Sequence, residues 1–519
     1  MNPIHLGIDV GTSGVKVLAV DSAGVVLSSQ TEHLDFDRPH DGWAETPPGR
    51  WWDATAAASR RLMNELGTNC IVASVGLSGQ MHGSVFLDRS ALDHADTGPI
   101  DALYPALMWN DQRTDQQRSK IEGLIGGRRT GVESTGCPSL NGLTAPKILW
   151  FREHEPKKFD RVAGICLPKD FIALQLTGVF ATDVGDASGT MLVDPRTRDW
   201  NPSVLSSLGI GRELLPSIVE SGTVVGRITA WAAQTTGLPE GVPLIIGSGD
   251  NQAAAIGAGV IDHGEALAIL GTSGVVLAPT DSPTPDLGTT PGRLNLFCDS
   301  AGRGHQRGQW ILSGCMLSAA GSLEWARDVI APGVAFEQLD AEASHVPPGC
   351  EGLIFLPYLT GERCPIPDPT ARGGWIGLTR SHTRGHLIRA VLEGVSFALA
   401  QIMDIVRDLA GPASRIRVTG GGAKSELWRQ ILADAFEAPV APLQISEGSA
   451  LGAAAMGAFG VSDKRDIREI TSQWVHLETP TEPAPTQAFG QARCVYDRLY
   501  QDLRPAFAAL SGHLQVDNK

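Results

Sequence analysis

Two copies of one pentapeptide, GTSGV, are the first candidates for chemistry in this 519-residue sequence. They occupy residues 11–15 and 271–275, each between runs of apolar and β-branched residues. A turn of small residues exposes backbone N–H groups and hydroxyls, so it can hold a phosphate with no side chain in the way. The alternative is a plain hairpin turn, which Gly, Thr and Ser also favour. Two such turns on facing lobes could hold one polyphosphate from both sides.

Two aspartates stand where a carboxylate would act on a phosphate or on a hydroxyl. Asp9 lies two residues before the first turn, where the second copy has Ile269. A carboxylate beside a phosphate suits hydrated Mg²⁺, which prefers oxygen ligands and keeps several waters. Asp250 follows a predicted strand in the segment GSGDNQ, where it could accept a proton from a substrate hydroxyl. The spacing fits an N-cap of the following helix equally well.

Two further glycine-rich segments end predicted strands. In GQMHG, at residues 79–83, Met81 and His82 could line a pocket, although a lone histidine is more often structural. The GGG at residues 420–422 would let the backbone approach a flat ligand, or it is an ordinary turn from strand to helix. The sequence has no Gly-Lys dipeptide, and GSGDNQ lacks the last glycine of GxGxxG. A P-loop or Rossmann nucleotide site is therefore disfavoured.

The elements that must position these residues follow the same order in both halves. Residues 4–27 alternate as a β-meander and 51–66 have helical spacing; a strand, a small-residue helix and a hairpin then follow from residue 244. Two related lobes explain the repeat better than chance does. The length also favours two large domains with a cleft between them. We expect lobes at 1–245 and 246–475, then a linker and a C-terminal helix at 476–519.

Later elements are predicted from apolar spacing. Helices are expected at residues 147–152, 312–329, 386–409, 425–436 and 488–510, with a strand in RIRVTGGG.

Charge and cysteine usage exclude several classes of protein. The net charge is −15 and no Lys/Arg block occurs, so a nucleic acid partner is not expected. No signal peptide pattern and no run of about 18 apolar residues is found, which predicts a soluble cytoplasmic protein without a membrane partner. The eight cysteines are scattered with no CxxC pair, as is typical of reduced thiols and not of a zinc site.

Taken in order, six segments resemble the FGGY carbohydrate kinases. They are GIDVGTSGVK, GQMHG with LMWND, GLTAPKILWFREH, GSGDNQAA, GWIGLTRSHTRGHLIRAVLEG and GGGAKSELWRQ. The resemblance covers nearly the whole chain. It implies an α/β, two-lobed sugar kinase/actin/Hsp70 fold, a duplicated RNase H-like architecture with a central cleft. It further implies transfer of phosphate from ATP, with Mg²⁺, to D-xylulose, giving D-xylulose 5-phosphate.

The resemblance also implies a role for each candidate residue. Asp250 would be the general base, and Asp9 would lie near Mg²⁺. Met81 and His82 would contact the sugar, with Asp111 and Asn251 as further sugar contacts. The cofactor contacts would be Gly11, Thr12, Ser13, Gly14, Gly271, Thr272 and Ser273 at the phosphates, and Gly421 and Gly422 at the adenosine.

Some features leave alternatives open. Gln252 stands where a small residue is common, and the segment 299–310, with Arg303 and Arg307, is rich in Gly and Arg. A related kinase for ribulose, glycerol or an arabinitol-type polyol is one rival, and an actin-like or Hsp70-like protein is another. The role of Arg363, in FLPYLTGERCP, is open: it could shape the cleft or a subunit contact, and a buried structural ion pair is the default expectation. The sequence leaves open whether the chain forms a homodimer.

Overall fold

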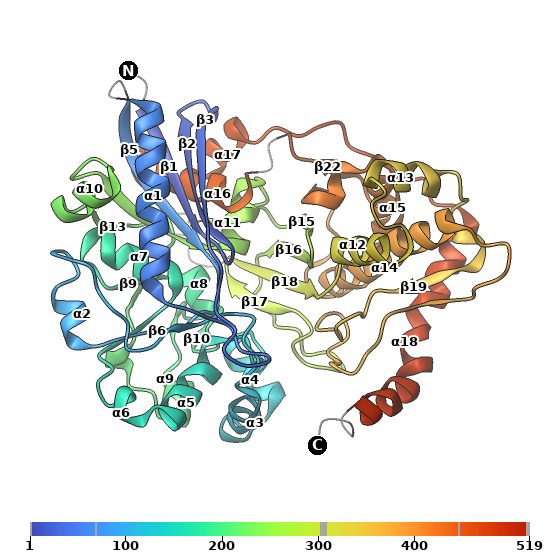
Figure 1. The fold of residues 1–519 in the computed structure, drawn as a ribbon, viewed down its shortest axis with the longest axis horizontal. Helices are drawn as coiled ribbons and strands as arrows, with labels where there is room; N and C mark the ends of the chain where they lie inside the picture. Colours follow the sequence, from blue (N-terminus) through green and yellow to red (C-terminus); the bar gives the residue numbers. More distant parts are fainter. Residues whose placement is uncertain (1–2, 68–69, 302–308, 445–446, 465, 515–519) are drawn as a thin grey trace. The chain divides into compact units, whose positions relative to one another are not determined.

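The computed structural model describes residues 3–67, 70–301, 309–444, 447–464 and 466–514. Its contacts divide the chain into two compact units (Figure 1). The first unit comprises Met1–Ile261, Asp281–Ile311 and Glu447–His476; the second comprises Asp262–Thr280, Leu312–Ser446 and Leu477–Lys519. The predicted boundaries at residues 245 and 475 stay a prediction.

The first unit is built on a six-stranded sheet with the order β13-β14-β5-β1-β2-β3. Strand β1 pairs antiparallel with β2 and parallel with β5, which in turn pairs parallel with β14. The predicted meander is thereby confirmed. The strands are β1 (Pro3–Val10), β2 (Gly14–Asp21), β3 (Val26–His33), β5 (Ile71–Gly79), β13 (Val224–Arg227) and β14 (Pro243–Gly249).

Alternation along the strands sends side chains into two separate apolar clusters. In β2, Val15 and Val17 join the cluster with helix α1 (Pro48–Leu66), whereas Leu18 and Val20 join that with α11 (Asp250–Gly257) and α16 (Gly448–Gly460). Successive strand residues point to opposite faces, so one strand serves both clusters. The sheet, which mixes parallel and antiparallel strands, is therefore covered on both faces.

Helix α16 lies unusually close to the sheet because two strand residues lack side chains. A Cβ added to Gly7 would stand 2.0 Å from the Ala450 carbonyl oxygen, and one on Gly76 would stand 1.9 Å from that of Ala453. Any larger residue would push the helix away. This close approach brings the N-terminus of α16 to the end of β1, where Asp9 lies.

The second sheet repeats the strand order of the first around its own hairpin. Its order is β17-β18-β16-β15-β21-β22, with β15 antiparallel to β16 and parallel to β21. The series β22-β21-β15-β16-β18 thus matches β14-β5-β1-β2-β3, which supports the predicted duplication. The strands are β15 (Glu265–Leu270), β16 (Gly274–Thr280), β17 (Asn295–Cys298), β18 (Trp310–Met316), β21 (Arg415–Thr419) and β22 (Val440–Pro442).

One predicted helix is wrong in its first half. Residues 312–316 belong to strand β18, and helix α12 covers only Ala320–Ile330. A short apolar run fits a buried strand or a helix equally well, so spacing alone could not separate them. Helices were otherwise found where predicted: α1, α5 (Thr144–His154), α14 (Arg384–Ala410), α15 (Glu426–Phe436) and α18 (Gln487–Leu514).

The remaining elements are short and mostly join the two sheets to their helices. Among the described residues, no helix has the length and apolar run needed to span a bilayer. The further helices are α2 (Arg89–Asp93), α3 (Asp115–Leu124), α4 (Arg128–Thr135), α6 (Pro156–Phe159), α7 (Pro168–Thr177), α8 (Val184–Ser188), α9 (Pro202–Leu208), α10 (Ala230–Thr236), α13 (Phe336–Ser344) and α17 (Arg468–Trp474), with 3₁₀ turns at Arg212–Leu214, Cys350–Gly352 and Gly421–Lys424. The further strands are β4 (Glu45–Thr46), β6 (Val85–Leu87), β7 (Ala106–Leu107), β8 (Gly164–Cys166), β9 (Ala181–Asp183), β10 (Val193–Asp194), β11 (Asp199–Trp200), β12 (Ser217–Val219), β19 (Ile354–Leu356) and β20 (Gly374–Ile376).

Candidate active site

The first GTSG turn joins β1 to β2 as a hairpin. The Gly11 N–H donates to the Gly14 carbonyl at 2.9 Å, and Thr12 and Ser13 remain open to solvent in part. Neither glycine has a positive φ. Gly14 is required for another reason, because a Cβ there would stand 2.6 Å from the carbonyl oxygen of Glu32. The turn is thus a small, open loop, as a phosphate site would need, but its glycines allow close packing and not an unusual backbone.

Asp9 presents one free carboxylate oxygen at the end of β1. Its Oδ2 accepts a 2.6 Å hydrogen bond from the Ser449 hydroxyl at the start of α16, while its buried Oδ1 has no partner among the described residues. Burial raises the pKa of this carboxyl. A carboxylate oxygen left without a donor fits a Mg²⁺ ion that takes its other ligands from phosphates and water. No set of three or more His, Cys, Asp or Glu side chains in the described chain could hold a metal by itself.

Asp250 is the first residue of α11, directly after β14. The N-cap position belongs to Gly249, which has no side chain to cap the helix. The alternative reading of Asp250 as an N-cap is therefore wrong. Burial, and next the negative charge of Asp9, raise the pKa of Asp250 to about 7. A carboxyl whose pKa lies near the working pH is suited to general-base catalysis.

Met81 and Asn251 lie against each other next to Asp250. The Asn251 amide approaches the Met81 sulfur at 3.8 Å, and a Cβ on Gly249 would stand 2.5 Å from Met81 Cγ. The structure therefore brings Met81 next to the adjacent pair Asp250 and Asn251, although 170 positions separate Met81 from Asn251. Met81 is 2% exposed and His82 8% exposed, so both side chains are almost completely buried. We call this pair the Met81–His82 wall.

His82 adopts a left-handed backbone conformation that a second segment holds in place. Its φ is 68°, and its ring Nδ1 lies 2.8 Å from the Gly189 carbonyl oxygen. Its own carbonyl accepts hydrogen bonds from Lys147 Nζ at 2.9 Å and from the Thr144 hydroxyl at 3.1 Å. A non-glycine residue with positive φ needs such support. Lys147, whose pKa burial lowers to about 7, was not singled out from the sequence.

Asp111 occupies a different environment from the other predicted sugar contacts. Both of its oxygens are engaged by Arg113, and its Oδ2 also accepts the Ala44 N–H at 2.7 Å. Arg113 in turn pairs with Glu45 at 2.6 Å, and these groups are almost wholly buried. This is a structural ion-pair network. A contact of Asp111 with sugar stays a prediction.

Two residues missed by the sequence analysis touch the first GTSG turn. Gln80 Nε2 donates to the Gly11 carbonyl at 3.3 Å, and the Gln80 N–H donates to that of Val10 at 2.9 Å. The indole N–H of Trp109 donates to the Thr12 hydroxyl at 2.9 Å. Gln80 directly precedes Met81, so one segment contacts the turn and carries Met81 and His82, the two predicted sugar contacts. The motifs GQMHG and LMWND contained both residues, but no local pattern showed what they would touch.

The second turn, in the second unit, is held by the start of helix α12. The Gly271 carbonyl accepts the Ala320 N–H at 2.8 Å, and the Thr272 carbonyl accepts those of Ala319 and Gly321. As in the first turn, glycine permits close packing, since a Cβ on Gly274 would stand 2.8 Å from Met316 Cγ. The Gly271 and Thr272 carbonyls are thus hydrogen-bonded to the start of the helix, which leaves the hydroxyls of Thr272 and Ser273 for other partners.

Gly420, the first of the three glycines after β21, lines a cavity of about 360 Å³ in the second unit. Gly420 has a φ of 95°, and a Cβ on it would stand 2.5 Å from the Leu270 carbonyl oxygen. A Cβ on Gly421 would meet nothing within 4 Å, whereas Gly422 packs on Trp428. The lining residues are Val418, Thr419, Gly420, Ala423, Lys424, Arg429, Pro442, Leu443, Gln444 and Glu478.

In the segment FLPYLTGERCP the buried ionisable side chain is Glu362 and not the neighbouring arginine. Glu362 Oε1 accepts the N–H groups of Leu317 at 2.9 Å and Arg363 at 2.7 Å, and burial raises its pKa to about 8. Arg363 is half-buried and pairs with no acidic side chain in the described chain, so the expected ion pair is wrong. The residues Arg303 and Arg307 lie outside the described residues.

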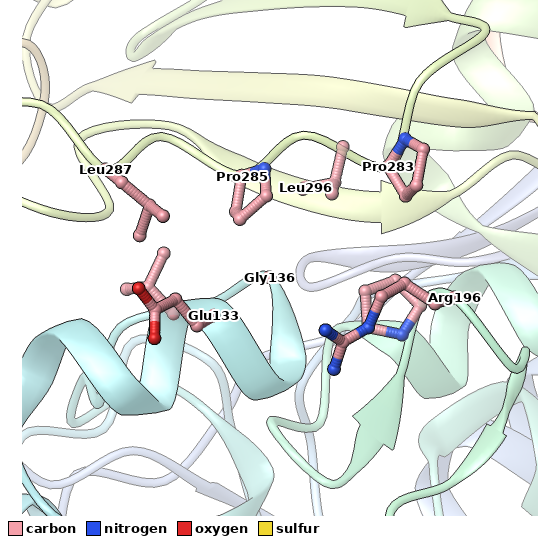
Figure 2. A pocket seen from close by; sticks show the side chains of 9 residues that line it. Glu133, Gly136, Arg196, Pro283, Pro285, Leu287 and Leu296 are labelled. Atoms are coloured by element: carbon pink, nitrogen blue, oxygen red, sulfur yellow. The ribbon is translucent and has the colours of Figure 1, made fainter.

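A separate cavity of about 250 Å³ in the first unit contains none of the predicted site residues. Figure 2 shows Glu133 and Arg196 at its walls with several prolines and leucines. Both charges are already matched, since Arg196 pairs with Asp194 and Glu133 with Arg129. We assign no ligand to it.

The two sheets of equal strand order define a duplicated α/β fold of the sugar kinase type. Residues 4–257 match the N-terminal domain, and residues 266–461 the C-terminal domain, of the FGGY family of carbohydrate kinases. The chain belongs to this family, which confirms the predicted resemblance. It is therefore a phosphotransferase that acts on a sugar hydroxyl.

Individual relatives resemble the chain over almost its whole length. It is 36% identical to a xylulose kinase of Escherichia coli (97% of this chain, 100% of the relative) and 33% identical to one of Bacillus subtilis (91% of each). A solved xylulose kinase from Rhodospirillum rubrum superposes with a TM-score of 0.88 at 28% identity, covering 97% of this chain and all of the other.

Proposed function

We propose that the chain is a xylulokinase, which transfers the γ-phosphate of ATP to the terminal hydroxyl of D-xylulose and yields D-xylulose 5-phosphate. One observation carries the proposal most strongly. Asp250 has a pKa raised to about 7 and lies beside Asn251, whose amide contacts Met81. A base next to a small, mostly buried wall suits a hydroxyl acceptor. The xylulose kinases among the relatives support the choice of sugar.

In this mechanism Asp250 removes the proton from the attacking hydroxyl as the oxygen bonds to the γ-phosphorus. The Met81–His82 wall and Asn251 orient the sugar so that its terminal hydroxyl faces the carboxylate. Phosphoryl transfer requires little covalent help from the protein, so that positioning and charge neutralisation account for most of the rate. The strained backbone of His82, fixed by Lys147 and Thr144, keeps this wall in one conformation.

The phosphates of ATP are proposed to contact both GTSG turns, each through the groups its own unit leaves open. These are Gly11, Thr12, Ser13 and Gly14 in one unit and Gly271, Thr272 and Ser273 in the other. Gly421 and Gly422 would approach the adenosine, next to the cavity after β21. Asp9 Oδ1 would hold Mg²⁺, which when bound neutralises charge on the phosphates.

A coupled assay of ADP release over a panel of sugars tests the proposal. D-xylulose should give the highest kcat/KM among xylulose, ribulose, glycerol and arabinitol. A higher value for ribulose or a polyol would replace the proposed substrate with the rival one, because one hydroxyl shifts selectivity by only a few kcal/mol. ADP release that responds to no sugar would contradict the kinase proposal itself.

The role of Asp250 has its own test in the same assay. Asp250→Ala should lower kcat about 10²- to 10⁴-fold, which is the usual contribution of a general base. Asp53, exposed on α1, provides the control Asp53→Ala, which should keep the wild-type rate. A variant Asp250→Ala that keeps more than about a tenth of the turnover would show that another group accepts the proton.

We place the enzyme in the cytoplasm, and the state of its thiols supports this location. All eight cysteines are free, and five of them are buried: Cys137, Cys166, Cys298, Cys350 and Cys364. Unpaired thiols are usual in a reducing compartment. The proposal also includes a homodimer, which light scattering of the purified protein would test.

A further inference from the structure

The carboxylate of Asp183 gathers four hydrogen-bond donors in the first unit. Asp183 ends strand β9 and caps helix α8, and its Oδ2 accepts the backbone N–H groups of Gly185 at 2.8 Å and Asp186 at 3.2 Å. The same oxygen accepts the hydroxyls of Ser221 at 2.7 Å and Ser248 at 2.9 Å. Asp183 has no exposed surface. One buried atom therefore ties together two strands, a helix and a loop.

A buried lysine balances this charge. Lys169, in helix α7, contacts Asp183 Oδ1 at 2.8 Å and Asp170 Oδ1 at 2.6 Å, with Asp186 at 3.8 Å. The side chains of Lys169, Asp170, Asp183 and Asp186 are all 0% or 1% exposed. Several buried carboxylates around one ammonium group are costly to form and rarely arise for stability alone. The cluster therefore calls for a role beyond packing.

Two of its contacts lead directly to the candidate active site. Ser248 lies in β14, two residues before Asp250. Helix α8 also contacts the segment after Asp250, because the Gln252 amide donates to the Gly185 carbonyl at 3.2 Å. The carbonyl of Gly189, the residue after the helix, lies 2.8 Å from Nδ1 of the His82 ring. Asp183 thus holds both β14, the strand that leads into Asp250, and helix α8, which lies next to His82.

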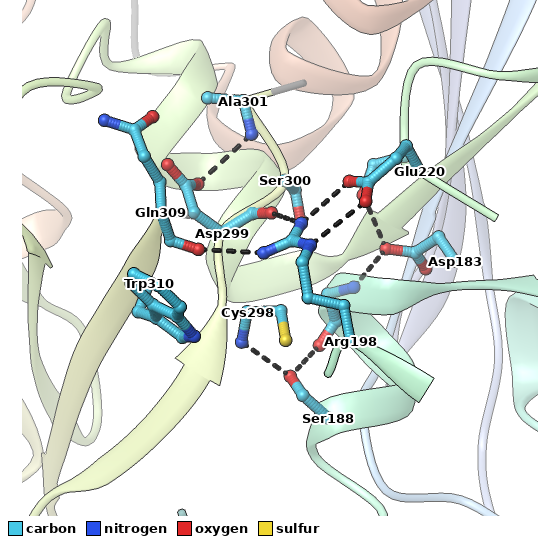
Figure 3. Close-up of polar contacts among 12 residues, drawn as sticks. Asp183, Ser188, Arg198, Glu220, Cys298, Asp299, Ser300, Ala301, Gln309 and Trp310 are labelled. Carbon is cyan, nitrogen blue, oxygen red and sulfur yellow. Dashed lines mark hydrogen bonds and ion pairs between the residues drawn. The ribbon is translucent and has the colours of Figure 1, made fainter. Parts of the chain in front are cut away.

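A second set of contacts fixes Ser248 from its other side. Its hydroxyl lies 2.5 Å from that of Ser300. Figure 3 shows the Arg198 guanidinium between Glu220 and the backbone carbonyls of Asp299 and Gln309, with distances of 2.7 to 3.0 Å. Arg198 therefore keeps the residues before and after the undescribed segment 302–308 together, and so keeps Ser300 against Ser248.

We propose that Asp183 is a positioning residue for phosphoryl transfer, acting through Ser248 on Asp250 and through helix α8 on His82. This inference rests on the proposed function, because it takes Asp250 as the base. Asp183 itself touches no substrate. Its effect should appear in the rate of the chemical step and not in the binding of ATP, since a base displaced by about 1 Å can cost up to about a hundredfold in rate.

Two serines offer a matched pair for the test. Ser221 and Ser248 are both fully buried, and both donate to the same oxygen of Asp183. Only Ser248 lies on β14, the strand that leads directly into Asp250. Ser248→Ala should lower kcat for D-xylulose about ten- to a hundredfold while leaving KM for ATP within about twofold of wild type. Ser221→Ala should lose a similar amount of thermal stability but keep kcat.

Equal kcat values for the two variants, whether high or low, would overturn the proposal. If Ser248→Ala does not fold, Gln252→Ala replaces it, because that variant loses the contact of α11 with α8 and should lower kcat in the same way. A Gln252→Ala variant with wild-type kcat would then overturn it. Asp250→Ala measured alongside separates the two levels: full activity of that variant refutes the base, whereas its loss with an active Ser248→Ala refutes only the positioning role.

Discussion

The negative charge of Asp9 acts on Asp250, and together with burial, which contributes more, it raises the pKa of Asp250 to about 7. The two carboxylates come from strand β1 and from the first turn of α11. One has a free oxygen suited to a metal ion, and the other is poised to take a proton. The residue proposed to bind Mg²⁺ therefore also influences the pKa of the proposed base.

The pH dependence of activity follows from this relationship. Asp250 accepts a proton only when it is ionised, so kcat/KM for the sugar should rise with pH and level off above a midpoint near 7. Asp9→Asn removes one of the two causes that raise the pKa, so its midpoint should lie at lower pH. Rates measured from pH 5.5 to 9 would check both; a midpoint that Asp9→Asn leaves unchanged would contradict the electrostatic link.

Loss of the Asp9 carboxylate should weaken the response to Mg²⁺ much more than it weakens the binding of the sugar. Asp9→Asn replaces the unpartnered oxygen with a neutral amide, and we expect the Mg²⁺ concentration at half-maximal rate to rise about tenfold, a loss of ~1.4 kcal/mol. KM for D-xylulose should stay near the wild-type value. Titration of Mg²⁺ at fixed ATP measures the first and a sugar titration the second, with Asp53→Asn as the control; equal losses in both would refute the metal role.

Local patterns predicted the hairpins and long helices because the information lies within each segment. The alternation in β1 and β2 and the 3.6-residue spacing of α1 and α14 are set by which neighbours must be buried. The helix predicted at residues 312–316 was wrong because a short buried strand and the start of a helix share one apolar pattern. The turn glycines were found by composition, but the reason for them, close approach at Gly14 and Gly274, appears only in three dimensions.

The candidate site was only partly readable for a similar reason. Asp250 and Met81 could be singled out because their residue types suit the chemistry and they follow predicted strands, whereas Asn251 was expected only from the resemblance to the family. Their support could not, because it comes from distant segments: Lys147 binds the His82 carbonyl 65 residues away, and Asp183 binds Ser248 across the same number of positions. The resemblance implied that Asp111 contacts the sugar, yet both its oxygens already have partners. Residue type therefore suggests which chemistry is possible, but contacts between distant segments determine which side chains are free to perform it.

ATP binding should be sensitive to a single methyl group at Gly421. A Cβ there meets no protein atom within 4 Å, so Gly421→Ala should fold and melt like the wild type. If the backbone approaches the adenosine closely, the added methyl should raise KM for ATP about tenfold and leave KM for sugar unchanged. Gly374→Ala, equally unobstructed in the same unit, should change neither. An unchanged KM for ATP in Gly421→Ala would remove this glycine from the nucleotide site.

Glu362 should make the stability of the second unit depend on pH. Burial raises its pKa from the ordinary 4.5 to about 8, so the folded protein keeps this proton to a higher pH than the unfolded chain does. The free energy of unfolding should therefore fall between about pH 4.5 and pH 8, by at most ~1.4 kcal/mol per pH unit from this one group. The loss of stability arises because the carboxylate, once ionised, lies in a buried site where its hydrogen-bond donors are backbone N–H groups.

Glu362→Gln keeps the oxygen that accepts the Leu317 and Arg363 N–H groups and cannot ionise. The variant should match the wild type at pH 5 and become the more stable of the two as the pH approaches 8, because only the wild type then buries a charge. Melting temperatures measured at intervals across this range give the difference directly. Glu426→Gln, at an exposed position in the same unit, should melt in parallel with the wild type throughout. A constant gap between Glu362→Gln and wild type would mean that Glu362 is ionised in the folded protein at every pH tested.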